Sequence, residues 1–398
     1  MELLLVNGVF PPDEYGGAEH YIQRVATALQ SRGTDVAILT TTPNEGRNSR
    51  GVQAETYEGI PTYRFSPMNL SHRSNGTGGN IVTKAIWHQF DTINPHAQRI
   101  VREFLNRHQP ATVHTHNFMG ITAATGRAIA ESSARHVHTL HDYSLICPKS
   151  NLLRDMTVPG DEVTVCEEPP TPCRIYASAK RRMIGQPDVV IGPSQHIIDV
   201  HTRHGFFQDV TTTCIRHGVG SCAESIPETT TDSVLYVGKH LKAKGLETLF
   251  AAARQCREVT IHLCGTGPID ERSQVVADQL QNVIYHGYVS EERLDELRQK
   301  VAATIVPSLW MENAPLVIYE SFAAGVPVIG ADIGGIPELV TPDRGISFPP
   351  GDEKALTDAI QKIVDNSTVQ RRTNALSWAK DHSMEEHLNA LLETYELE

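Results

Sequence analysis

The sequence predicts an α/β protein made of two Rossmann-like domains, each built on a parallel sheet. Two observations support this prediction: short apolar runs alternate with helical patterns along the chain, and the alternation comes in two separate series. A length of 398 residues suits two domains, and 40% hydrophobic with 21% charged residues is typical of a globular protein.

The first series opens with an apolar run at Leu3–Phe10, a loop that ends in Gly16 and Gly17, and a helical pattern at Ala18–Ser31. A second run follows at Val36–Thr40, which completes a βαβ unit of the kind that builds parallel sheets. The alternation continues through apolar runs at Thr112–His116, Arg135–Leu140 and Asp188–Ile191. We therefore expect an N-terminal domain over residues 1–205.

The second series predicts a C-terminal domain over residues 232–377, with residues 206–231 as the connection. Its expected strands are Ser233–Gly238, Thr260–Leu263, Val283–His286, Ala303–Val306 and Pro327–Gly330. Residues 378–398 are helical in pattern, and we expect this helix to cross back and pack on the first domain. Ligands of open α/β sheets bind beyond the carboxyl ends of the strands, so the pattern predicts one site in a cleft between the domains.

Charge is distributed unevenly along the chain. The net charge of -12 argues against a nucleic-acid partner, since such proteins need basic surfaces. The first 205 residues carry 19 basic and 19 acidic residues, so the excess of acid lies in the second half. Any peripheral contact with an anionic membrane or glycan is therefore expected on the N-terminal half, where Lys180–Arg182 is the densest basic cluster; a solvated helix face is the alternative.

The sequence has no apolar stretch as long as the roughly 18 residues that a membrane helix needs, and its first residues lack signal-peptide features. We therefore expect a cytoplasmic protein that is at most peripheral at the inner face of the membrane.

Seven cysteines do not indicate a disulfide framework. Cys147, Cys166 and Cys173 flank a Pro-rich segment without the close pairs of a zinc site; a metal or redox role is the alternative to ordinary thiols.

The segment Pro307–Gly325 carries the strongest chemical signal. A strand ends near Pro307 and a helix is expected to start at Pro315, so the first-turn amides near Leu316 and Val317 suit a diphosphate. Glu320 could accept hydrogen bonds from two vicinal hydroxyls, and Glu312 from a sugar. The alternative is that Glu320 pairs or caps locally while Glu312 is a surface loop residue.

These residues occur in a pattern that resembles the retaining nucleotide-sugar glycosyltransferases of family 4, which have the GT-B fold. The matching stretches, which belong to a likeness over nearly the whole chain, are Glu312 and Glu320 with Ala314–Leu316 between them, Ala323–Ile329 and Gly334–Val340. The resemblance implies that the donor is bound along the segment Asn313, Ala314, Pro315, Leu316, Val317 and Glu320.

Further stretches agree with this family in order and spacing. Lys239, after Gly238, and Lys244 resemble its paired basic residues for the diphosphate, although the family usually has Arg at the first position; Lys keeps the charge but not the planar fork. Gly265 and Gly267 resemble the turn beneath the nucleotide, and Tyr288 lies in the loop that would hold the base.

In the first half, Gly16 and Gly17 resemble the family's loop near the donor phosphates, though an ordinary βα turn also favours glycine. His141, at the end of an expected strand, matches the histidine that contacts the transferred sugar. His114 and His116 are weaker candidates, and a structural role is the alternative for each.

The resemblance implies transfer of a sugar from a nucleotide diphosphate, expected to be UDP, to a hydroxyl of a glycan, lipid-linked or small-molecule acceptor. The catalytic candidates are His141, Glu312, Lys239 and Lys244. The chain lacks an Asp-x-Asp motif, so lysines and a helix dipole are expected to replace a metal, and no cofactor is expected. Alternatives are a non-catalytic nucleotide-sugar binder, an epimerase or a phosphorylase; a covalent intermediate on a carboxylate also stays open.

Overall fold

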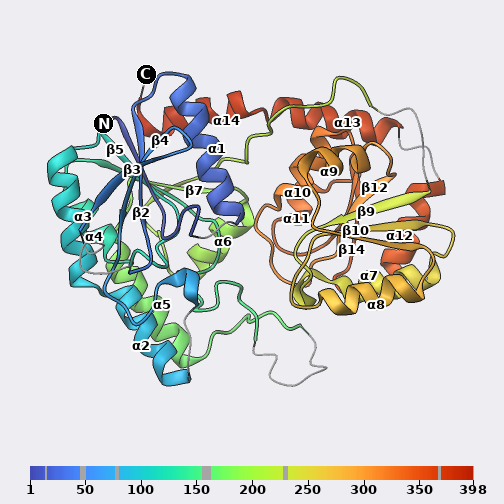
Figure 1. Ribbon diagram of the computed structural model, residues 1–398, viewed down its shortest axis with the longest axis horizontal. Helices are drawn as coiled ribbons and strands as arrows, with labels where there is room; N and C mark the ends of the chain where they lie inside the picture. The colour runs from blue at the N-terminus through green and yellow to red at the C-terminus, as the bar shows by residue number, and fades with distance from the viewer. Residues whose placement is uncertain are drawn as a thin grey trace. The chain divides into compact units, whose positions relative to one another are not determined.

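The computed structural model describes residues 1–13, 16–44, 51–76, 80–154, 163–226, 232–365 and 369–397. The chain divides into two compact units. Unit 1 comprises Met1–Leu152, Glu167–Ile215 and Leu388–Glu398, and unit 2 comprises Leu153–Cys166 and Arg216–His387. Helices lie on both sides of the sheet in each unit (Figure 1), which confirms the predicted α/β class with two largely parallel sheets.

Unit 1 contains an eight-stranded sheet in the order β3-β4-β2-β1-β5-β6-β7-β8. Its strands are β1 (Leu3–Val6), β2 (Val36–Thr41), β3 (Gln53–Tyr57), β4 (Ile60–Phe65), β5 (Thr112–Thr115), β6 (Arg135–Thr139), β7 (Val189–Gly192) and β8 (Thr211–Cys214). Its helices are α1 (Gly17–Ser31), α2 (Ile81–Thr92), α3 (Pro95–His108), α4 (Thr125–Ala130), α5 (Thr171–Ile184) and α6 (Gln195–Arg203), with the short 3-10 turn η2 (Arg73–Asn75).

Unit 2 contains a six-stranded parallel sheet in the order β11-β10-β9-β12-β13-β14. Its strands are β9 (Ser233–Val237), β10 (Thr260–Cys264), β11 (Val283–Gly287), β12 (Ala303–Val306), β13 (Val328–Ala331) and β14 (Gly345–Phe348). The helices from this part of the chain onward are η3 (Lys242–Lys244), α7 (Leu246–Gln255), α8 (Asp270–Gln279), α9 (Glu291–Arg298), α10 (Leu316–Ala323), α11 (Ile336–Leu339), α12 (Glu353–Asp365), α13 (Val369–Asp381) and α14 (Met384–Tyr395).

Burial explains which strands the sequence revealed. Central strands such as β1 and β12 are fully buried, because helices cover both faces of a parallel sheet and such strands are continuous apolar runs. The edge strand β3 is mostly exposed and polar, and it pairs antiparallel with β4 through a turn at Glu58 and Gly59, both with positive φ. The sequence analysis did not identify this hairpin, because its first strand has no apolar run.

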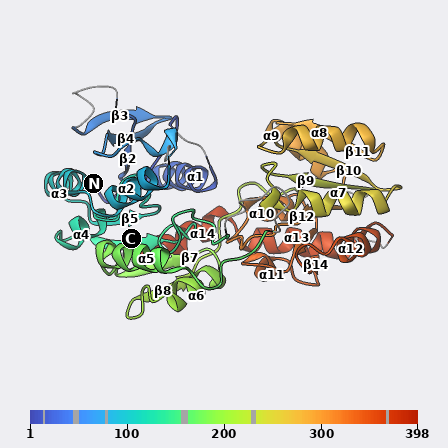
Figure 2. The same cartoon turned by 90° about the horizontal axis from the view of Figure 1, so that it is seen from below.

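Each sheet has one point at which the strand order reverses. In unit 2 the order runs from β9 outward to β11 on one side and from β12 to β14 on the other, so the reversal lies between β9 and β12 (Figure 2). In unit 1 it lies between β1 and β5. The loops that follow the strands at such a point diverge and leave a crevice for a ligand. The loops after β9 and β12 are those that carry the sequence-predicted residues.

The ends of the units differ from the expected boundaries. Unit 1 extends to Ile215, because β8 adds to its sheet inside the stretch expected to be the connection. Residues 378–398 are not one helix: Trp378 lies in α13 and packs on Phe322 of unit 2, with 5.3 Å between ring centroids. Only the residues from Leu388 onward belong to unit 1, where the Tyr395 hydroxyl lies 2.7 Å from Nδ1 of His114.

Candidate functional site

Glu312 and Lys244 lie together at the strand-order reversal of unit 2. Glu312 follows β12, is only 6% exposed, and its Oε1 lies 2.5 Å from Nζ of Lys244. The Ser308 hydroxyl and the Trp310 indole N–H also donate to Oε1, at 2.9 and 2.8 Å. The ammonium lies 5.5 Å from the centre of the Trp310 ring, which further favours a cation there. The sequence-predicted carboxylate and lysine therefore form one ion pair, in which the Glu312 side chain is buried and the Lys244 side chain is 27% exposed.

Two glycines in the loop after β13 (Val328–Ala331) lie against the backbone of Glu312. The backbone N–H of Gly335 donates to the Glu312 carbonyl at 2.7 Å. Gly334 has a φ of 64°, and a Cβ there would come within 2.3 Å of that carbonyl oxygen. Only glycine allows the two chain segments to approach so closely, which explains Gly334 of the motif.

Glu320 has a partner that the sequence did not reveal. Its Oε2 accepts from Nη2 of Arg298 at 2.6 Å, and the Arg298 side chain is only 3% exposed. Asp295 on the same helix as Arg298 binds the other guanidinium nitrogen at 2.9 Å. The local pairing that was the alternative for Glu320 is thus present, and it holds the carboxylate in one orientation on α10.

The helix α10 begins one residue later than expected. Pro315 is its N-cap and Leu316 its first residue, so the first-turn amides still belong to Leu316 and Val317. Ala314 is packed in an apolar cluster with Ile318 and Phe322, so only its backbone could meet a ligand. Asn313 is half-buried in the loop before the helix.

The loops after β9, β10 and β11 pack closely against one another. Gly265 has a φ of 120°, and a Cβ there would lie 2.0 Å from the carbonyl oxygen of Gly238. The backbone N–H of Gly265 donates to the Gly287 carbonyl at 2.7 Å, and Gly267 lies against the backbone of His240. These glycines are therefore required by chain packing itself. Lys239 and Tyr288 stand exposed beside them, Tyr288 at 86%.

Sequence reasoning missed His240, which directly follows Lys239. Its side chain is fully buried, with Nδ1 3.2 Å from an oxygen of Asp270, which also accepts from the Tyr285 hydroxyl at 2.8 Å. Burial lowers the pKa of His240, while Asp270 opposes this shift. The sequence feature that could have indicated His240 was its position just after an expected strand. His240 anchors the loop that carries Lys239.

In unit 1, His141 and His116 form a pair at the ends of β6 and β5. Nδ1 of His116 lies 3.0 Å from Nε2 of His141, and the Tyr21 ring packs on both imidazoles. Burial lowers the pKa of His141 to about 4, and burial with the neighbouring His114 holds that of His116 well below its usual value. Both rings are therefore neutral near pH 7.

The hydrogen-bond network assigns the protons of this pair. Nε2 of His116 is buried without a partner in the described part of the chain, and an unpaired buried acceptor is more readily tolerated than an unpaired donor. We therefore place the proton of His116 on Nδ1, donating to Nε2 of His141. His141 then carries its own proton on Nδ1, because a neutral imidazole has only one.

His114 has a structural role instead. Its Nδ1 pairs with the Tyr395 hydroxyl and its Nε2 with the Thr139 hydroxyl, both at 2.7 Å, so both ring nitrogens bind within the protein.

Gly16 is the N-cap of α1, and a Cβ at Gly17 would meet no atom within 4 Å, so there is open space beside this backbone. Glu14 and Tyr15 of the same loop lie outside the described residues.

Two further expectations concern charge and cysteine. Lys180 of the basic cluster is not a surface residue: its side chain is 1% exposed and pairs with Asp91, so only Arg181 and Arg182 of that cluster are exposed. The prediction that Lys180 belongs to a basic surface cluster was therefore wrong.

All seven cysteines are free, with Cys147 buried and Cys166 and Cys173 half-buried. Among the described residues, no group of three or more His, Cys, Asp or Glu is arranged to hold a metal.

Two family models match the chain: "Glycosyl transferase 4-like domain" over residues 16–214 and "Glycosyl transferases group 1" over residues 223–378. The chain belongs to the group 1 glycosyltransferases. This glycosyltransferase is 27% identical over 347 residues to an uncharacterised 42.6 kDa protein in the cps region of Klebsiella pneumoniae. The alignment covers 85% of this chain and 87% of that protein.

Its fold matches the GT-B structures of other glycosyltransferases. Sucrose-phosphate synthase from Thermosynechococcus elongatus superposes with a TM-score of 0.74 at 19% identity, covering 100% of this chain and 98% of that chain. The Anabaena protein Alr3699/HepE, solved in complex with UDP, has a TM-score of 0.68 at 17% identity and covers 99% of both chains. The GT-B prediction is thereby confirmed.

Proposed function

We propose that this glycosyltransferase transfers a sugar from a UDP-sugar to a hydroxyl of a glycan, lipid-linked or small-molecule acceptor, with retention and without a metal. The observation that carries the proposal is the Lys244–Glu312 ion pair, whose carboxylate is buried, at the strand-order reversal of unit 2 beside the first turn of α10. The UDP complex of the similar Anabaena structure supports the choice of nucleotide.

Lys244 can serve the carboxylate and a diphosphate together. An ammonium has three N–H donors, and one is directed at Oε1 of Glu312. The remaining donors, the exposed Lys239 and the amides of Leu316 and Val317 would bind diphosphate oxygens and stabilise the charge that develops on them during departure.

The sugar would be held by Glu312 as an acceptor and by His141 as a neutral donor, and the ribose by Glu320 as an acceptor. Lys244, Ser308 and Trp310 all donate to Oε1 of Glu312, so within the described part of the chain Oε2 is left for a sugar hydroxyl. His141 would present its Nδ1 proton, and Glu320, oriented by Arg298, would accept from the ribose. Gly16 and Gly17 would allow the phosphates close to the backbone, while Gly238, Gly265, Gly267 and Tyr288 shape the nucleotide side.

In the proposed step the bond between the anomeric carbon and the phosphate oxygen breaks, and the acceptor oxygen bonds to that carbon from the same face. The acceptor's proton passes to the departing phosphate oxygen, so the products are the glycosylated acceptor and UDP. No protein nucleophile takes part in this step; a covalent intermediate on a carboxylate is the competing route.

Melting scans with UDP, GDP and ADP in the presence of a chelator test the donor assignment. UDP should raise the melting temperature of the protein, and the chelator should not change this, because stabilisation follows from ligand binding to the folded state alone. Stabilisation only by GDP or ADP would contradict the choice of base. Stabilisation by UDP that disappears with chelator would contradict metal independence.

A further inference from the structure

The residues that directly follow the paired histidines of unit 1 form a second pair. Asn117 follows His116 after β5, and Asp142 follows His141 after β6. Nδ2 of Asn117 donates to Oδ2 of Asp142 at 2.9 Å, while the two imidazoles lie 3.0 Å apart. Two successive side-chain contacts therefore join the loops after β5 and β6, so the contact between Asn117 and Asp142 constrains the position of His141.

The backbone of Asn117 is anchored on the loop after β1. Its N–H donates to Oδ1 of Asn7 at 2.9 Å, and its carbonyl accepts from the backbone N–H of Gly8 at 2.8 Å. Asn7 is fully buried, and Gly8 lies so close to Met119 that a Cβ on this glycine would meet the Met119 carbonyl oxygen at 1.9 Å. Because both of its backbone groups are bound, Asn117 carries its side chain on a rigid support.

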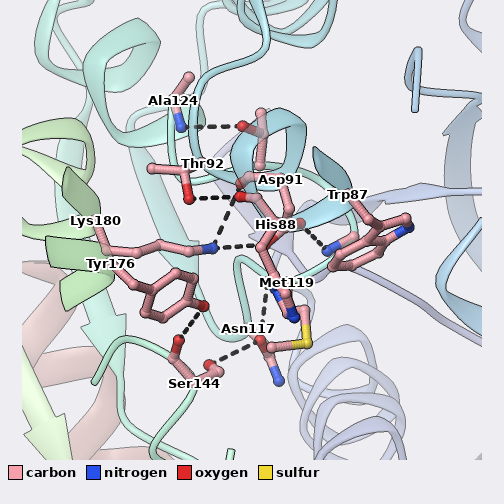
Figure 3. Close-up of polar contacts among 12 residues, drawn as sticks. Trp87, His88, Asp91, Thr92, Asn117, Met119, Ala124, Ser144, Tyr176 and Lys180 are labelled. Carbon is pink, nitrogen blue, oxygen red and sulfur yellow. Dashed lines mark hydrogen bonds and ion pairs between the residues drawn. The ribbon is translucent and has the colours of Figure 1, made fainter. Parts of the chain in front are cut away.

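The side-chain amide of Asn117 has one orientation. Its Oδ1 accepts from the backbone N–H of Met119 at 3.0 Å and from the Ser144 hydroxyl at 3.3 Å (Figure 3). A backbone N–H only donates and a carboxylate only accepts, so the amide oxygen faces Met119 and the amide nitrogen faces Asp142. Asn117 is 7% exposed, and both ends of its amide bind within the two loops. It therefore acts on a ligand through its neighbours.

The helix α5 also holds both loops. The Tyr176 hydroxyl donates to the carbonyl of Ser144 in the β6 loop at 2.7 Å (Figure 3). One turn further along α5, Nζ of Lys180 lies 2.6 Å from Oδ2 of Asp91, and the other oxygen of Asp91 accepts from the backbone N–H of Gly120 in the β5 loop at 2.6 Å. Both side chains of this ion pair are at most 1% exposed, so separating them is costly. One helix thus fixes the two loops.

Both carboxylate oxygens of Asp142 are bound. Oδ2 accepts from Asn117, and Oδ1 accepts from the backbone N–H of Ser144 at 2.7 Å. Burial lowers the pKa of the adjacent His141 to about 4, and the charge of Asp142 opposes this shift. Asp142 therefore influences His141 both by holding its loop in place and by its charge, and these two effects can be separated by experiment.

We propose that Asn117 is a positioning residue for sugar transfer, which holds His141 through its hydrogen bond to Asp142. The inference rests on the proposed contact of His141 with the sugar. A displacement of the imidazole by about 1 Å would cost much of that contact, because such groups are effective only within a narrow range of positions. A network that served the fold alone would stabilise unit 1 and leave transfer unaffected.

Three variants of the full chain test this proposal. Asn117→Asp sets a second carboxylate against that of Asp142, and their repulsion should lower kcat for sugar transfer about thirtyfold without changing UDP affinity. Asp142→Asn should lower kcat about tenfold, because a single amide oxygen cannot accept from both Asn117 and Ser144. The double variant Asn117→Asp/Asp142→Asn keeps these hydrogen bonds with one donor and one acceptor exchanged, so its kcat should return to within about twofold of the wild type.

An NMR measurement makes the test independent of activity. In protein with nitrogen-15-labelled histidine, the ring proton between His116 and His141 should give a signal that shifts or disappears in Asn117→Asp and returns in the double variant. If the wild type transferred no sugar from a UDP-sugar, the proposed function would fail, whereas this signal would still show whether Asn117 holds the histidine pair. An unchanged signal in folded Asn117→Asp would overturn the positioning role.

Asn282→Asp is a matched control in unit 2. Nδ2 of Asn282 donates to the carbonyls of Ala253, Cys256 and Val259 at 3.0, 3.0 and 3.1 Å, before β11 begins. The control should lower the melting temperature and leave kcat unchanged. The proposal is overturned if Asn117→Asp has wild-type kcat, or if Asn282→Asp loses as much activity. If Asn117→Asp does not fold, a double variant no more active than Asp142→Asn overturns it.

Discussion

The two regions that carry the proposed chemistry handle charge in opposite ways. In unit 2, Lys244 and Glu312 form an ion pair, with further N–H and O–H donors directed at one carboxylate oxygen. In unit 1, His116 and His141 lie 3.0 Å apart, and burial holds the pKa of each imidazole far below its usual value. One region keeps charges, and the other removes them.

This difference suits the ligands that we propose for the two regions. A diphosphate carries charge that increases as it departs, so fixed cations and helix amides are effective there. A sugar offers only neutral hydroxyls, and a neutral imidazole can donate to them without the desolvation cost of a buried cation. The contrast gives four predictions.

The largest expected effect is the loss of stability of unit 1 in acid. Burial lowers the pKa of His136, His141 and His201 to about 4, whereas the unfolded chain binds these protons near 6.5. The unfolded state therefore holds more protons between pH 6.5 and about 4, and the free energy of unfolding falls as pH falls through this window, by up to about 3 kcal/mol for each histidine.

Hydrogen exchange at about pH 7 and about pH 4.5 should show earlier loss of protection in unit 1 than in unit 2. The variant His201→Leu should flatten the pH dependence, because it removes one buried titrating group. Parallel loss of protection in both units would show that the histidines do not distinguish them.

The next effect concerns the charged pair. Lys244→Ala should lower kcat/KM by about 2 to 4 kcal/mol of transition-state stabilisation, since it removes a preorganised cation and leaves Glu312 buried. The exposed Lys242 in the same 3-10 turn offers a matched control, Lys242→Ala, with an expected effect near zero. Equal steady-state rates for the two variants would remove Lys244 from the diphosphate site.

Glu320 and Glu312 should separate binding from turnover. Glu320→Ala should weaken UDP binding by about 1 to 3 kcal/mol through lost ribose hydrogen bonds. Glu312→Gln should leave UDP affinity nearly unchanged and depress turnover. Calorimetry with UDP alone decides this, and Glu320→Gln controls for the effect of Arg298 on stability. An equal loss of UDP affinity in both glutamate variants would show that the assignment is wrong.

The smallest effect tests whether His116 acts through His141. His116→Phe should weaken binding of the UDP-sugar about fivefold and leave UDP affinity unchanged, because the donor hydrogen bond that orients His141 is lost. His116→Asn, which keeps a donor near the position of Nδ1, should restore part of the affinity. If UDP and UDP-sugar affinities fell together, the role of His116 would be purely structural.

The pattern of apolar residues predicted most strands of the two sheets, because a buried strand appears in the sequence as a short apolar run. The expected run Ala303–Val306 coincides with β12, and the run from Ser233 ends within one residue of β9. The same approach missed the edge strands β3, β8 and β14 and the neighbouring strand β4, since none of them carries a continuous apolar run. It also merged α13 and α14, because a helical pattern does not show where a chain changes its packing partner.

The candidate residues were found where a motif gathers them within a few residues. Glu312, Pro315 and Glu320 occupy one loop and the helix that follows it, so spacing alone indicated their shared location. The sequence identified Lys244 but not its pairing with Glu312, and it did not identify Arg298, because Lys244 precedes Glu312 by 68 residues and Arg298 precedes Glu320 by 22. Such pairs depend on which strands and helices become neighbours.

The sequence alone therefore determined the α/β class and the two sheets, since hydrophobic periodicity is a local property, and the family resemblance supplied the proposed chemical groups. Tertiary structure decided the state of those groups. It paired Lys244 with Glu312, made His116 and His141 neutral by removing them from water, and buried Lys180 against Asp91, a residue 89 positions away. Burial and charge pairing depend on everything that packs around a side chain, and that is settled only when distant segments meet.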